Sequence, residues 1–157
     1  MKFVEESIID SVAVRIGTSE RERQQAIKSL ESEQPTLLAY LFSENFKVFL
    51  PQEREYILFL VLVVLESVKE ATQQTIPTIS EEALSLAEEA NWEKMQQINA
   101  KRFRERLDVF FEDTPQEDLL AFIEDALVDE EEGLLSKVGR EPIFIVLKSI
   151  VDALQKM

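Results

Sequence analysis

Ten consecutive apolar residues, from Tyr56 to Leu65, restrict the fold of this 157-residue chain more than any other feature. Charged residues bound the run, with Glu55 before it and Glu66 after it. A membrane-spanning helix needs roughly 20 apolar residues, so this run is too short to span a bilayer. No other segment could pair with it as a strand, and we expect a helix over residues 51–74. Because the helix is apolar on every side, it has to be covered on every side, by the rest of a bundle or in part by a second subunit.

Prolines and helix-capping residues predict helices along the rest of the chain. Proline suits the first turn of a helix, and it stands at residues 35, 51, 115 and 142. Ser19 and Glu22 form a capping-box pattern. Apolar residues at helical spacing predict seven helices, at about 3–16, 19–33, 36–45, 51–74, 80–112, 115–130 and 141–155. The predicted fold is all-α, one domain over 1–157, a compact bundle of six or seven helices around the apolar helix 51–74.

Two residue types are missing from the chain, and their absence excludes several classes of site. The chain has no His and no Cys, which argues against zinc centres, imidazole catalysis, thiol nucleophiles and disulfides. Its three glycines are too few for a phosphate-binding loop. Glu5 and Glu6 lie where a secretory signal needs an uninterrupted apolar stretch. We therefore expect a cytoplasmic protein with no membrane segment.

The negative charge is concentrated in one segment. The chain has 31 acidic and 17 basic residues, a net charge of -14, and residues 112–132 contain ten carboxylates and no cation. Five cations, at residues 94, 101, 102, 104 and 106, come directly before that segment. One interpretation is that the two stretches neutralise each other across a helical hairpin, as charged helix faces often do. Acidity of this size also argues against binding a nucleic acid backbone.

The other interpretation is that the acidic segment is a docking surface for a basic protein, helped by electrostatic steering. On this hypothesis the chain is a non-enzymatic interaction module, of the adaptor or inhibitor type, without a cofactor. A homodimer is compatible with it, because the apolar helix needs more cover than a chain of this size readily supplies. The predicted docking residues are Glu117, Asp118, Glu124, Asp125, Asp129, Glu130, Glu131 and Glu132.

The alternative is an enzyme that uses carboxylates to hold Mg²⁺ and acts on a phosphorylated, nucleotide-like substrate. Glu105 and Asp108 resemble the Glu-x-x-Asp element of the MazG-like nucleotide pyrophosphohydrolases. The family's Glu-Glu-x-x-Glu element is matched incompletely, because Trp92 stands in place of the third Glu and Glu93 follows one residue late. The family also places its two elements on separate helices, whereas the predicted helix 80–112 contains both. The resemblance implies Mg²⁺ ligands at Glu89, Glu93, Glu105 and Asp108.

Aromatic and apolar residues from Trp92 to Phe111 form a stripe that Asn99 interrupts. Such stripes are usually part of a core. The polar residues Gln96, Gln97 and Asn99 indicate that one part of this stretch is only half-buried. A groove or a subunit contact is the second interpretation of this region.

Overall fold

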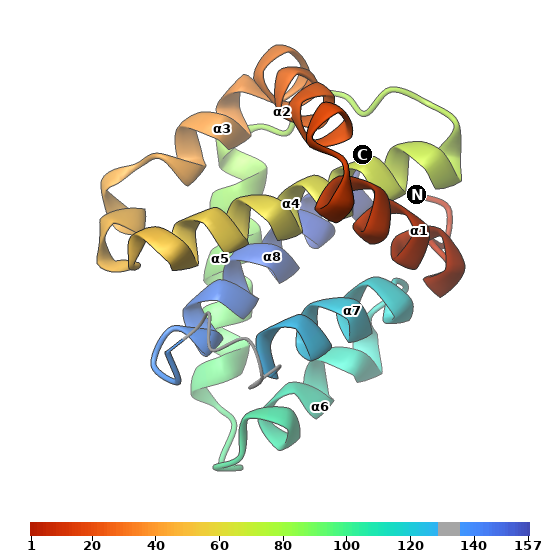
Figure 1. Ribbon diagram of the computed structural model, residues 1–157. Coiled ribbons are helices and arrows are strands. Elements are labelled where there is room, and N and C mark those ends of the chain that lie inside the picture. Colours follow the sequence, from red (N-terminus) through yellow and green to blue (C-terminus); the bar gives the residue numbers. More distant parts are fainter. Residues whose placement is uncertain (129–135) are drawn as a thin grey trace.

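The computed structural model describes residues 1–128 and 136–157, and these residues fold into a compact, all-helical body with no strand. Their eight α-helices and one short 3-10 helix are shown in Figure 1. The elements are α1 (Glu6–Thr18), α2 (Glu20–Glu33), α3 (Pro35–Leu41), η1 (Glu44–Val48), α4 (Pro51–Thr72), α5 (Glu81–Gln96), α6 (Phe103–Asp113), α7 (Glu117–Val128) and α8 (Arg140–Gln155).

Four predicted helix starts are confirmed, and a capping residue or a proline marks each of them. The Ser19 hydroxyl accepts a hydrogen bond from the Glu22 N–H at 3.2 Å, as a capping residue should. Ser80 accepts one from the Ala83 N–H at 3.1 Å, just before α5 begins. Pro35 and Pro51 are the first residues of α3 and α4. These local signals therefore mark the starts of α2, α3, α4 and α5, whereas α7 begins at Glu117, two residues after Pro115.

Two helices, rather than one, occupy the middle of the body. In α4 every residue from Leu60 to Leu65 is buried, as its composition predicts. In α8 every residue from Ile143 to Val151 is buried as well, whereas the apolar residues at helical spacing predicted only a helix over 141–155. The two helices contact each other, with α1 packed on α4 and α5 packed on α8 (Figure 1). The core is therefore built on a pair of buried helices.

Polar partners allow the polar residues of α8 to be buried. Lys148 is 7% exposed, and its ammonium group is paired with Asp152 one turn later. The Asn91 amide of α5 donates hydrogen bonds to the Ser149 hydroxyl at 3.1 Å and to the Asp152 carboxylate at 3.0 Å. Buried charges and amides are tolerated when they are paired in this way.

The prediction of one helix over 80–112 is wrong, because the helix is interrupted: α5 ends at Gln96 and α6 begins at Phe103. Neither Gly nor Pro marks the break, and the Arg106 side chain stabilises it instead. The Arg106 guanidinium donates hydrogen bonds to the carbonyls of Ile98 at 3.1 Å and Ala100 at 2.8 Å. It also donates to the Glu141 carboxylate of α8 at 2.9 and 3.0 Å. Two carbonyls of the connection between α5 and α6 are thereby satisfied from the start of α6.

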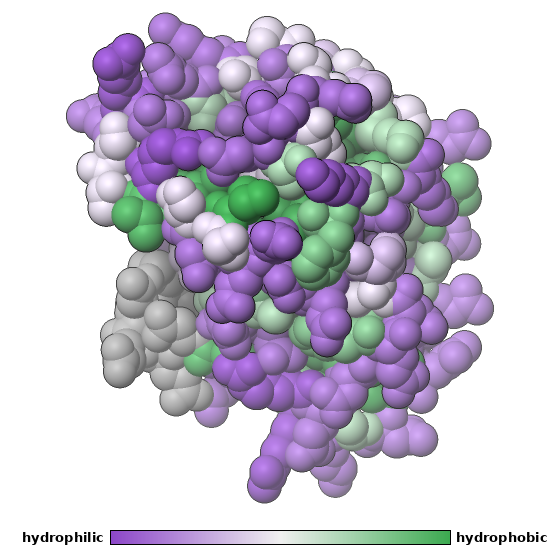
Figure 2. All heavy atoms as spheres, turned by 90° about the vertical axis from the view of Figure 1, so that its right-hand side faces the viewer, coloured by the Kyte–Doolittle hydropathy of each residue, from purple (hydrophilic) through white to green (hydrophobic). Residues whose placement is uncertain are grey.

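Figure 2, which faces the side of the molecule where α1 lies, shows hydrophilic side chains over most of the surface and apolar side chains exposed between them. The longest helix, α4, has 22 residues. None of the helices in the described ranges is long and apolar enough to cross a membrane.

Candidate functional site

A groove of about 370 Å³ lies where α1, α4 and α7 meet. Its apolar lining comes from all three helices, and aromatic rings contribute much of it. Part of the apolar run of α4 therefore stays accessible here, because Tyr56 and Phe59 are only half-buried. The apolar lining consists of Ile9, Tyr56, Phe59, Leu60, Ala121, Phe122 and Ala126.

Four carboxylates line the same groove, two from α1 and two from α7: Glu6, Asp10, Asp118 and Asp125. Residues four or seven apart lie on the same face of a helix, so each helix directs its pair toward the groove. No Lys or Arg is among the groove's lining residues in the described part of the chain. Carboxylates beside an apolar, low-dielectric wall concentrate a negative potential. The groove is therefore suited to a group that is both cationic and partly apolar.

The two α7 carboxylates also have partners within the protein. The Asp118 carboxylate accepts a hydrogen bond from the Glu6 backbone N–H at 2.9 Å, which joins α7 to the first turn of α1. Asp125 is 3.3 Å from the Arg104 guanidinium, although its side chain is 72% exposed. The side chains of Glu6 and Asp10 have no hydrogen-bond or ion-pair partner among the described residues. The α1 side of the groove thus presents free negative charge.

The aromatic floor of the groove is fixed in place. The Tyr56 hydroxyl donates a hydrogen bond to the Ala126 carbonyl of α7 at 2.9 Å. Its ring lies nearly parallel to that of Phe59, with the ring centroids 6.3 Å apart and an interplanar angle of 16°. A floor that is already ordered loses little conformational entropy when a partner binds.

The structure brings only part of the predicted docking surface into this groove. Asp118 and Asp125 line it, whereas Glu117 is exposed outside it. The Glu124 side chain is 15% exposed and is paired with Arg104 of α6. Burial raises the pKa of Glu124, and the attraction of Arg104 opposes this shift. The predicted docking residues Asp129, Glu130, Glu131 and Glu132 lie outside the described residues.

The interpretation of local charge neutralisation is confirmed at two places. Arg104 pairs with both Glu124 and Asp125, which joins α6 to α7. Lys94, at the end of α5, lies 3.1 Å from the Asp113 carboxylate. Part of the acidic segment is therefore neutralised by the cations that precede it, and the groove carboxylates of α1 are not.

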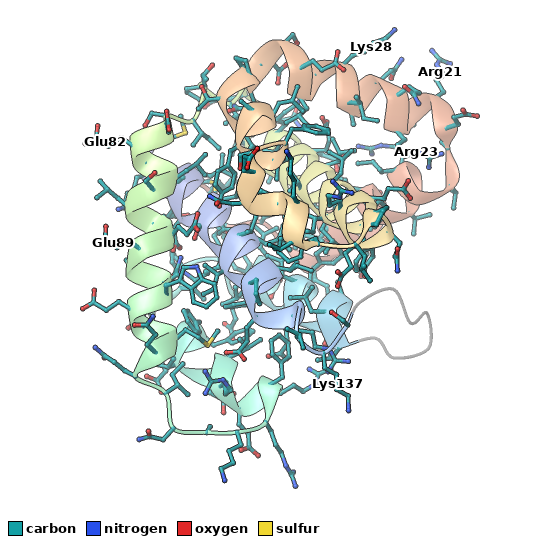
Figure 3. The ribbon with its side chains drawn as sticks, turned by 90° about the vertical axis from the view of Figure 1, so that its left-hand side faces the viewer. Arg21, Arg23, Lys28, Glu82, Glu89 and Lys137 are labelled. Atoms are coloured by element: carbon teal, nitrogen blue, oxygen red, sulfur yellow. The ribbon has the colours of Figure 1, made fainter. Side chains whose placement is uncertain are left out.

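The four residues of the phosphohydrolase hypothesis lie on two helices, with Glu89 and Glu93 on α5 and Glu105 and Asp108 on α6. All four are exposed, and Glu89 points away from the body of the molecule (Figure 3). The break after Gln96 gives the separate helices that the MazG-like arrangement has. Within the described ranges, however, no three Asp or Glu residues are grouped closely enough to hold a metal ion.

A second, more polar cleft of about 500 Å³ lies between α3 and α5, and half-buried Trp92 lines it. Gln96, Gln97 and Asn99, which led us to expect a groove in this region, are exposed at or just after the end of α5 and do not line this cleft. The Tyr40 hydroxyl donates a hydrogen bond to the Glu88 carboxylate across the cleft. Burial, together with this carboxylate, raises the pKa of Tyr40. Tyr40 and Glu88 satisfy each other, which leaves the cleft without a free catalytic group at that point.

Glu6, Asp10, Tyr56 and Phe59 are groove residues that the sequence did not identify as a site. The four-residue spacing of Glu6 and Asp10 is common in acidic chains, and Tyr56 and Phe59 were visible only as part of the apolar run. No family model, no curated protein and no solved structure matches this chain. The function is therefore inferred from the groove and its charges.

Proposed function

We propose that the protein is a non-enzymatic, cytoplasmic interaction module, of the adaptor or inhibitor type. Its groove between α1, α4 and α7 would bind a segment of a partner protein that is both basic and apolar. The observation that carries the proposal is the meeting of four carboxylates and an aromatic floor, with no cation among the lining residues that the structure describes.

The two components of the groove favour the same kind of ligand. Lys and Arg have long aliphatic stems that cover apolar surface while the charged end reaches an acidic rim. Their charged ends also interact favourably with aromatic faces such as those of Tyr56 and Phe59. An amphipathic helix can present both features to a groove at once. Oppositely charged surfaces additionally accelerate association.

The Mg²⁺-dependent alternative has less support from the geometry. Its four carboxylates are exposed on two helices, and the described residues do not gather them with others into a metal-binding group. The docking hypothesis, in contrast, has two of its predicted residues, Asp118 and Asp125, in one groove. We therefore favour docking.

The proposal can be tested by nuclear magnetic resonance on the isotopically labelled full chain. Three peptides of equal length are titrated: a Leu/Lys amphipathic helix, its Leu/Glu counterpart, and oligolysine. We expect the Leu/Lys peptide to shift the amide signals of α1 and α7 around Asp10 and Ala121 and the side-chain signals of Phe59. The Leu/Glu peptide should shift none of them, and oligolysine should bind more weakly because it cannot use the aromatic floor. Equal binding of oligolysine, or shifts elsewhere on the protein, would contradict the proposed groove.

A further inference from the structure

A second groove, of about 440 Å³, lies on another side of α4, where α3, η1 and the start of α4 meet. This end of the molecule is at the left in Figure 1 and faces the viewer in Figure 3. Its lining is mostly apolar, from Leu41, Phe42, Phe46, Pro51, Ile57 and Leu58. Among the described residues, it shares no lining residue with the acidic groove between α1, α4 and α7. The two grooves are therefore separate surfaces.

Several apolar side chains at the rim of this second groove are exposed to solvent. Phe42, which lines the groove, is 73% exposed. Val48 and Leu50, within the next eight residues, are 80% and 49% exposed. Single exposed apolar residues are common, but a group of them beside an apolar groove marks an interaction surface.

The charges beside these apolar residues indicate what covers them. Arg54 and Glu55 both line the groove and are both exposed. In the described part of the chain, neither side chain has an ion-pair or hydrogen-bond partner. Lys47 differs, because it is already paired with Glu44 at 3.0 Å. The rim therefore carries one free cation and one free anion on adjacent residues.

We propose that this face joins two copies of the chain in a two-fold symmetric dimer. In such an interface residue i of one copy contacts residue j of the other, and j contacts i in turn. Arg54 of each copy would then meet Glu55 of the other, which forms two ion pairs. Phe42 of each copy would enter the partner's groove. A uniformly basic or uniformly acidic partner would instead leave one of the two free charges facing a like charge.

The buried helix α4 is consistent with this arrangement. The sequence left open that a second subunit covers part of its apolar run. The rest of the chain covers the second part of the run, from Leu60 to Leu65, whereas Leu58, near its start, remains half-buried in the second groove. A second copy would cover what the first leaves accessible at this end.

The proposal is tested by sedimentation equilibrium of the full chain and three variants. We expect the wild-type chain to dimerise at micromolar concentration. Phe42→Asp and Arg54→Glu should each weaken the dimer by about tenfold or more, because the first places a charge in the groove and the second opposes like charges. Arg54→Glu combined with Glu55→Arg exchanges the two charges and should restore the dimer to near wild-type strength.

The matched control is Val14→Asp, since Val14 is 64% exposed on α1, away from this face. It should leave the dimer unchanged. A wild-type chain that stays monomeric up to about 100 µM, far above the dissociation constant of a specific interface, would overturn the proposal. So would a dimer that survives Phe42→Asp, or one that the charge exchange does not restore. Circular dichroism is used to check that each variant is folded.

Discussion

The Asp118 carboxylate of α7 accepts a hydrogen bond from the Glu6 backbone N–H, 112 residues earlier in the chain. Glu6 is the first residue of α1, and the N-cap residue Glu5 makes no capping hydrogen bond with its own side chain. A carboxylate from another helix thus satisfies an N–H at the helix start that a capping residue would otherwise satisfy. The same hydrogen bond holds α1 beside α7 at the acidic groove.

This relationship predicts that Asp118→Ala lowers the free energy of unfolding by about 1 kcal/mol, the usual value for a lost helix cap. Asp118→Asn should cost less, because its amide oxygen can still accept the hydrogen bond. Urea denaturation measures both. Asp10→Ala is the control, since Asp10 lines the same groove without a partner among the described residues. An equal loss for Asp10→Ala would show that the hydrogen bond is not the cause.

The carboxylate of Glu53 leaves no room for a side chain at Gly139, the residue before α8. A Cβ atom at residue 139 would lie 2.7 Å from Glu53 Oε2. Glu53 is 3% exposed, and Oε2 accepts hydrogen bonds from the Ser136 N–H at 3.2 Å and the Ser136 hydroxyl at 3.1 Å. The carboxylate therefore cannot move away without losing them.

We expect Gly139→Ala to destabilise the protein by about 1–3 kcal/mol, as overpacking of a buried site does. The control is Gly17→Ala in α1, where the new Cβ would have its nearest neighbour at 3.8 Å, on Phe59. Alanine is favoured over glycine in a helix, so this variant should be neutral or more stable by up to about 1 kcal/mol. Thermal unfolding distinguishes the two. A tolerated Gly139→Ala would contradict the close contact with Glu53.

The Arg106 guanidinium stabilises the break between α5 and α6. Its side chain is 20% exposed, and it donates to both backbone carbonyls and Glu141. Lysine keeps the charge but not the planar fork of donors, so Arg106→Lys should cost about 2 kcal/mol. Arg102→Lys, on a side chain that is 87% exposed, should change stability by less than about 0.5 kcal/mol. Chemical denaturation compares the two variants, and equal effects would refute this role.

The burial of Glu124 leads us to predict how the free energy of unfolding changes with pH. Burial raises its pKa in the folded state, so the folded protein holds this proton more tightly than the unfolded chain. The stability that this protonation contributes is complete below the unfolded pKa and is lost as the pH rises through the folded pKa. Glu124→Gln lacks this titration. The free energy of unfolding of the wild type minus that of the variant should therefore fall between about pH 4 and pH 7, and a rise over this interval would contradict the burial of the charge.

The helices could be predicted where their signals are local. Ser19, Ser80 and Pro51 mark helix starts through their own side chains, and the structure places the starts there. The break after Gln96 could not be predicted, because Arg106 satisfies it together with Glu141, 35 residues further on. The full burial of α8 was also missed because it depends on long-range contacts. Lys148 can be buried because it pairs with Asp152, which in turn accepts a hydrogen bond from Asn91 of α5.

The candidate groove was predicted on one side only. Asp118 and Asp125 stand out in the sequence because their segment has no cation. Glu6 and Asp10 join them only because α1 packs beside α7. That packing is set by long-range contacts, such as the 3.0 Å hydrogen bond from the Val4 N–H to the Gln116 side chain. Such a contact cannot be predicted from the residues that surround Val4 or Gln116 in the sequence.

The most direct test of the account measures how a charge reversal in the groove changes the affinity for a basic, apolar ligand. The ligand is a fluorescently labelled Leu/Lys amphipathic peptide, and fluorescence anisotropy gives its dissociation constant for the full chain and two variants. Asp10→Lys changes a groove carboxylate. Glu82→Lys makes the same change of charge on α5, where Glu82 points away from the body (Figure 3). We predict that Asp10→Lys weakens binding about tenfold and that Glu82→Lys changes it less than about twofold. Equal losses for the two variants would mean that only net charge attracts the peptide, and they would contradict a docking site between α1, α4 and α7.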